Sequence, residues 1–169
     1  HDAGVQNDLA RVRLARSDSG AALAGFAGAV STDPTRVGEI ALGNVALVIR
    51  RIVLIQALIV LGSVFVGVGF VGKHPSTFGR VALLGIVIGV GSFLVVKWRG
   101  YLAGPQRRAA VAHALHSSKR LLAGAVLVGL AIIGLGVGVF LAGDGITSAV
   151  GLSFLLAAVP TALLPRPST

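Results

Sequence analysis

The chain has 169 residues, of which 54% are hydrophobic and 12% are charged, and its formal net charge is +9. A soluble domain carries about 25% charged residues, so this composition excludes an ordinary water-soluble globular domain. The chain contains no cysteine, which excludes disulfides, thiol catalysis and iron–sulfur ligation.

The N-terminal segment, residues 1–33, mixes charged residues with Ala, Gly and Ser and has few large apolar side chains. A helix of one or two turns is predicted within 8–16. It should be no longer, because the Ser-Asp-Ser-Gly sequence that follows it breaks helices. Segments this poor in large apolar residues rarely fold unaided. We therefore expect 1–33 to be a cytoplasmic segment that is ordered by a partner.

The sequence Asp33-Pro34 is a helix start signal, because Asp can cap free amides and Pro suits the first helical position. Apolar residues then recur at helical spacing as far as residue 51. This pattern predicts an amphipathic helix over 34–51. It lies at the inner membrane surface or runs directly into the first span, and the sequence leaves both arrangements open.

Four long apolar runs follow, and their only ionisable residue is Arg80 at the edge of the second run. Each run is long enough to cross the hydrocarbon core as a helix. The predicted fold is an all-α integral membrane protein, with a bundle of four transmembrane helices formed by two hairpins over 52–164 and a short tail, 165–169. The runs cover residues 52–72, 79–96, 121–143 and 146–164.

Basic residues lie almost entirely on one side of these runs. Thirteen of the 15 Lys and Arg residues fall before the first run, between the second and third, or after the fourth. The positive-inside rule then places both termini and the 97–120 loop in the cytoplasm. The Ala-, Val-, Gly- and Arg-rich composition is typical of bacterial membrane proteins of high-GC genomes, so we expect a multi-pass protein of the bacterial inner membrane.

The basic residues also predict contact with anionic lipid. A nucleic-acid partner is not expected, because no aromatic residues alternate with these arginines to form a stacking surface. The expected interface residues are Arg50, Arg51, Trp98, Arg99, Arg107, Arg108, Lys119 and Arg120.

The 97–120 loop contains a further predicted helix over 106–118, introduced by Gly104-Pro105. Trp98 and Tyr101 precede it, where amphipathic rings prefer the headgroup zone. The helix either rests on an anionic leaflet or belongs to an ordinary solvated loop.

An internal repeat with an offset of 69 residues is visible between the two hairpins. Arg50-Arg51 corresponds to Lys119-Arg120, and Gly67-Val68-Gly69 corresponds to Gly136-Val137-Gly138. Both hairpins run in the same sense, so the sequence suggests a parallel repeat, although apolar sequences of low complexity also produce such matches by chance.

Glycine forms the main motif within the apolar runs. Gly85 and Gly89 form a GxxxG pair, as do Gly134 and Gly138, with Gly136 between them. Small residues let membrane helices approach closely. Packing within the bundle is the favoured interpretation of these pairs, and contact with a partner protein is the alternative.

No catalytic, metal or cofactor site is predicted. His113 and His116 would share a helix face, but no Cys, Asp or Glu lies near them in the sequence. His74 and Asp144 are expected on the outer side, where no spacing supports a catalytic arrangement.

The function that we expect is that of a non-catalytic accessory or scaffold subunit of a larger membrane complex, such as an envelope transporter, bound to other integral membrane subunits. The alternative is a small homo-oligomeric transporter or channel for an uncharged or lipid-like solute. An enzyme acting on lipid is the third hypothesis. The lack of charged groups at depth disfavours proton or ion coupling.

Overall fold

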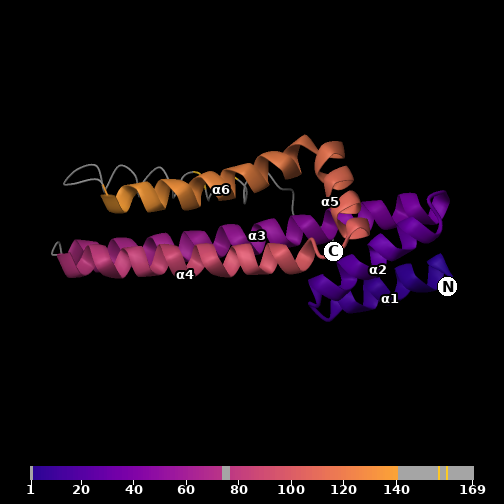
Figure 1. The fold of residues 1–169 in the computed structure, drawn as a ribbon, viewed down its shortest axis with the longest axis horizontal. Helices are drawn as coiled ribbons and strands as arrows, with labels where there is room; N and C mark the ends of the chain where they lie inside the picture. Colours follow the sequence, from indigo (N-terminus) through magenta and orange to yellow (C-terminus); the bar gives the residue numbers. More distant parts are fainter. Residues whose placement is uncertain (1, 74–76, 141–155, 157–158, 160–169) are drawn as a thin grey trace. The chain divides into compact units, whose positions relative to one another are not determined.

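The computed structural model describes residues 2–73, 77–140, 156 and 159. Over this part of the chain the fold is all-helical, as the sequence predicts, and Figure 1 traces its helices. The helices are α1 (Ala3–Ala15), α2 (Ser19–Thr32), α3 (Arg36–Lys73), α4 (Thr77–Tyr101), α5 (Pro105–Ser117) and α6 (Lys119–Phe140).

Two described helices are long and apolar enough to cross a membrane, over Arg36–Val66 in α3 and Leu84–Tyr101 in α4. A third candidate arises if α5 and the first part of α6, bent by 106°, count as one broken span. A membrane protein is therefore supported, while four spans are not shown. The predicted span over 146–164 lies outside the described residues, apart from two isolated positions.

The chain divides into two compact units. Unit 1 comprises His1–Ile52 and Val96–Leu122, and unit 2 comprises Val53–Val95 and Ala123–Thr169. Each unit is built from segments that are distant in the sequence.

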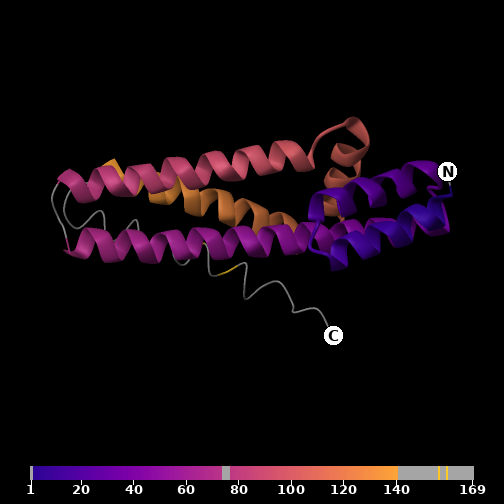
Figure 2. The same ribbon diagram turned by 90° about the horizontal axis from the view of Figure 1, so that it is seen from below.

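In unit 1, α1 and α2 form an antiparallel helical hairpin, which both ribbon views show (Figures 1 and 2). Asp2 caps α1 by accepting a hydrogen bond from the Gly4 amide at 2.8 Å, and Asp18 caps α2 through the Ala21 amide at 3.0 Å. Ser17 turns the chain between them in a left-handed conformation, with φ of 65°. The sequence predicted a short helix within 8–16 and none over 19–32, so it underestimated the helix content of 1–33.

The core of unit 1 forms where α2 packs against α1 and α5. Leu23 and Phe26 of α2 are fully buried, as are Val45, Val48 and Ile49 of α3. Around these few large side chains the helices approach through small residues. A Cβ built on Gly25 of α2 would lie only 2.8 Å from the Cβ of Ala10 on α1. Residues 1–33 are therefore held by close contact of small side chains.

The start of α3 differs slightly from the predicted one. The helix begins at Arg36, and Asp33 accepts a hydrogen bond from the Thr35 amide at 2.9 Å and another from the Thr35 hydroxyl. These two bonds, the hydroxyl bond first, lower the pKa of the Asp33 carboxyl below 3.8. Residues 36–51 then form the beginning of the single helix α3, which runs directly into the first apolar run.

Within unit 2, the buried positions of α3 recur every three or four residues, as expected for a helix packed along one side. Leu94 of α4 and Val128 and Ala131 of α6 are buried as well. The buried α3 residues are Val53, Gln56, Ala57, Val60 and Val64.

Burial does not follow the predicted 69-residue repeat. Gly124 of α6 is buried, whereas Ile55, its equivalent in α3, is 46% exposed. The two helices thus present different faces at equivalent positions, and duplication stays a prediction from sequence alone.

We expect Gly25→Ala to weaken the contact between α1 and α2 by about 1–3 kcal/mol, because the new methyl group overlaps Ala10. Hydrogen exchange of the α1 amides in the full chain would accelerate accordingly. The double variant Ala10→Gly/Gly25→Ala moves the methyl group from one helix to the other and should restore slow exchange. Gly43→Ala, at an exposed site with open space, is the matched control. Equal exchange in Gly25→Ala and Gly43→Ala would contradict the close contact.

Thr35→Val should raise the Asp33 pKa toward 3.8, because it removes the hydroxyl that favours the ionised carboxylate. Since the folded pKa is depressed, this interaction stabilises the fold fully above pH 3.8. The stabilisation is lost as pH falls below that value through the folded pKa. Carbon NMR titration of Asp33 measures the shift. Thr32→Val is the control, because its hydroxyl bonds to the Gly28 carbonyl instead; a similar pKa change in both variants would refute the assignment.

Candidate functional site

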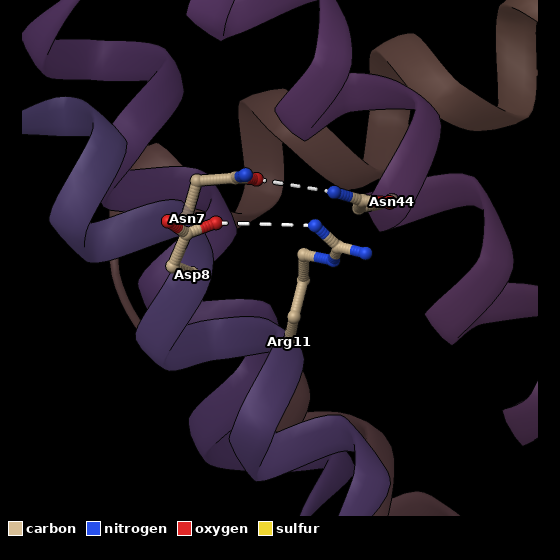
Figure 3. Close-up of polar contacts among 4 residues, drawn as sticks. All are labelled: Asn7, Asp8, Arg11 and Asn44. Carbon is tan, nitrogen blue, oxygen red and sulfur yellow. Dashed lines mark hydrogen bonds and ion pairs between the residues drawn. The ribbon is translucent and has the colours of Figure 1, made fainter.

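A polar junction joins α1 to the first part of α3. The Asn44 side-chain amide donates to the Asn7 side-chain oxygen at 3.1 Å, as Figure 3 shows. Further along, the Arg51 guanidinium donates to the Leu14 carbonyl at 3.0 Å and to the Ser17 hydroxyl at 2.9 Å. Asn7 and Leu14 each lie 37 residues before their partners. A constant separation means that α1 runs parallel to this part of α3.

Arg51 therefore has a structural role that the sequence interpretation missed. The last carbonyls of a helix have no partner within the helix, and a cation there is also favoured by the helix dipole. The Leu14 carbonyl already accepts a hydrogen bond from the Ser17 amide at 3.0 Å, so Arg51 adds a second donor to it and supports the left-handed Ser17 turn at the same time. Its neighbour Arg50 is half-buried, and its Nη2 atom is buried with no hydrogen-bond partner among the described residues.

The central basic segment shows a similar use of arginine. Arg107 donates to the Gly100 carbonyl at 3.2 Å, and Arg108 donates to the Leu102 carbonyl at 3.0 Å. Both bonds tie the start of α5 to the C-terminal end of α4. Gly104, with φ of 93°, makes the turn between these helices in a conformation that suits glycine. The helix predicted over 106–118 is confirmed as α5.

The other predicted interface residues are accessible. Arg99, Lys119 and Arg120 are exposed, and Trp98 is half-buried, with its ring edge-on to Tyr101 at a centroid distance of 6.2 Å. Six Lys and Arg residues and no Asp or Glu lie between Val96 and Leu122. This concentration of positive charge is compatible with anionic lipid headgroups, which stay a prediction.

The GxxxG pair of α4 lies on an exposed face of that helix. Gly85 and Gly89 are exposed, and no described atom lies within 4 Å of a Cβ built at either position. Val81, Ser92 and Val96 continue the same face and are exposed too. We call these five residues the α4 glycine face. The opposite side of α4 carries the buried Leu94, so among the described residues nothing packs on the glycine face.

The second glycine pair is less informative. Gly134 of α6 is half-buried. Gly136 and Gly138 belong to α6, and their surroundings lie outside the described part of the chain. Neither internal packing nor a partner contact follows for them.

The two histidines of α5 belong to no cluster of metal ligands in the described part of the chain. His113 and His116 are exposed on α5. The described residues contain no group of three or more His, Cys, Asp or Glu placed to hold a metal ion. His74 and Asp144, the outer residues considered from sequence, lie outside the described residues.

Comparison with known proteins indicates no function for this chain, so the proposal below is argued from its geometry. No family model matches the chain, and neither do the curated proteins or the solved structures.

Arg51→Lys should loosen the α1–α2 turn, because an ammonium group cannot reproduce the two-pronged contact with Leu14 and Ser17. The charge that sets topology is retained. We expect the amides of residues 16–18 to exchange about tenfold faster, equivalent to about 1.4 kcal/mol. Arg50→Lys is the matched control, with the same change one residue earlier and no bond to the turn. The assignment would be refuted by equal acceleration in both variants.

Proposed function

We propose that the protein is a non-catalytic accessory or scaffold subunit of a membrane protein complex, and that it docks through the α4 glycine face against a transmembrane helix of an unlike subunit. The observation that carries the proposal is the outward position of Gly85 and Gly89, with open space at both Cβ positions.

The two candidate spans differ in how much of their surface is buried, although α4 also exposes large apolar residues such as Ile88, Phe93 and Val95. In the most apolar stretch of each span, 44% of the α3 residues are buried but only 6% of the α4 residues. After Arg51 and as far as Val66, the exposed residues of α3 are mainly large and apolar, which suits contact with lipid tails. They are Ile55, Leu58, Gly62, Phe65 and Val66.

The α4 glycine face instead leaves backbone accessible at two positions one turn apart. Lipid tails gain little from such a surface, because they are as apolar as leucine and make no directional contacts with the backbone. A second helix gains close packing and weak hydrogen bonds along the same surface. The face therefore suits a helix better than lipid.

The lack of charged groups at depth supports an accessory role over a coupled transporter. The described parts of α3 and α4 that belong to unit 2 contain no ionisable side chain between Val53 and Val66 or between Val81 and Val95. Transporters that couple to ions or protons place such groups at membrane depth. We further propose that the complex lies in the bacterial inner membrane. The distribution of basic residues supports a cytoplasmic position for both termini.

The test is native mass spectrometry of the tagged full chain, extracted gently from its own membrane at natural abundance. We expect unlike subunits to accompany it. Gly85→Ile/Gly89→Ile adds two large side chains to this face and should reduce the recovered unlike subunits at least tenfold. Gly91→Ile is the matched control, because no described atom lies near its Cβ position either, but it lies about 120° around the helix from the centre of the glycine face.

One outcome would overturn the α4 contact, and two others would overturn the accessory role. Equal recovery of the partner with all variants would show that α4 is not the docking helix. A closed ring made only of this chain, lost in the double variant, would favour the alternative function of a homo-oligomeric channel for an uncharged or lipid-like solute. A compact monomer in the native membrane would refute both functions.

A further inference from the structure

The outer side of α1 carries an apolar stripe that no described residue covers. Val5 is 64% exposed, Leu9 is 48% exposed and Val12 is 49% exposed. The residues that α1 buries are smaller or polar, namely Ala3, Asn7 and Ala10. The helix thus turns three of its four large apolar side chains away from its own hairpin, and the fourth, Leu14, is half-buried. We call Val5, Leu9 and Val12 the α1 stripe.

The spacing of the stripe is that of a two-helix seam. The steps of four and then three residues match alternating d, a and d positions of a heptad, which pack against the same positions of a facing helix. Asp2 and Arg16 occupy the flanking a positions and bound the seam at its two ends. The seam is too short to hold two free helices together. Two chains anchored in one membrane have a raised effective concentration, and a short contact is then sufficient.

The direction of α1 determines which partner helix is possible. Asn7–Asn44 and Leu14–Arg51 hold α1 parallel to the part of α3 that enters the candidate span. All copies inserted in one membrane share the same orientation, so a second copy presents its α1 parallel to the first. This direction also disfavours the bilayer surface as the occupant, because an interfacial helix lies in the plane of the membrane.

The charges beside the stripe are complementary in that parallel arrangement. Asp8 flanks Leu9 on one side at a g position, and Arg13 flanks it on the other at an e position, five residues later. In a parallel pair, g and e residues of opposite helices form ion pairs. Among the described residues, Asp8 forms an ion pair within its own helix with the exposed Arg11, at 3.9 Å (Figure 3). Such an exposed pair is weak, so Asp8 is available to the second copy.

We propose that the α1 stripe is a homodimer contact, in which two copies of this chain pair their α1 helices in parallel about a two-fold axis normal to the membrane. Leu9 meets Leu9 of the second copy at the centre, and Asp8 pairs with Arg13 of the second copy twice by symmetry. The proposal is independent of the α4 glycine face. Two copies recovered together with unlike subunits fit both proposals.

Disulfide cross-linking tests the contact directly, because the chain has no cysteine of its own. Leu9→Cys in the full chain, reconstituted in vesicles at a low ratio of protein to lipid, should form a disulfide-linked dimer upon mild oxidation. Arg11→Cys is the matched control, on the same exposed helix but beside the stripe. We expect at least tenfold faster cross-linking of Leu9→Cys.

Charge reversal then distinguishes a specific pair from collision. Asp8→Arg added to Leu9→Cys should slow cross-linking at least fivefold, and the swap Asp8→Arg/Arg13→Asp should restore it. Equal rates for Leu9→Cys and Arg11→Cys would overturn the proposal. A second outcome would also overturn it. If Leu9→Cys did not cross-link, and a spin label attached to that cysteine showed that it is immersed in the bilayer, the stripe would be covered by lipid. Loss of unlike subunits in the α4 variants with intact α1 cross-linking would leave this contact standing.

Discussion

The contact of the Arg51 guanidinium with the end of α1 is the interaction on which the arrangement of unit 1 depends. It donates to the Leu14 carbonyl and to the Ser17 hydroxyl at the point where the chain reverses between α1 and α2. Together with the Asn7–Asn44 hydrogen bond it sets the register and direction of α1 along α3. Hydrogen bonds of a charged donor are stronger than neutral ones, and here they hold helices whose packed surfaces consist mainly of Ala and Gly.

Arginine at this position meets two physical demands at once. Positive charge beside an apolar run favours the cytoplasmic side of a membrane, which is the role predicted for Arg51 from the sequence. The forked guanidinium also has donors left over for backbone carbonyls. Arg107 and Arg108 repeat the second use at the end of α4. The basic residues of this protein are therefore partly committed to internal contacts with neutral carbonyls, which leave their positive charge in place, and Arg99, Lys119 and Arg120 add further exposed charge.

Glycine likewise has two uses that the structure separates. Gly25 permits a close approach between α1 and α2, where even a methyl group would overlap Ala10. Gly85 and Gly89 have open space instead and face away from the described chain. One residue type thus provides internal packing in one helix and accessible backbone in another. The internal packing favoured for the α4 pair from its sequence has no counterpart among the described residues.

The sequence by itself determined the all-helical class, the candidate spans in α3 and α4 and the helix α5, because apolar periodicity, run length and Gly-Pro turn signals are local properties. It underestimated α1 and α2, because hydropathy gives little weight to an Ala- and Gly-rich helix whose stability comes from close packing against a neighbour. It also could not identify the partners of Arg51, since they lie 34 and 37 residues away and become neighbours only when α1 folds back along α3. Which face of α4 and of α1 stays open was decided only by the tertiary structure, because a helix exposes whichever side its own chain leaves uncovered.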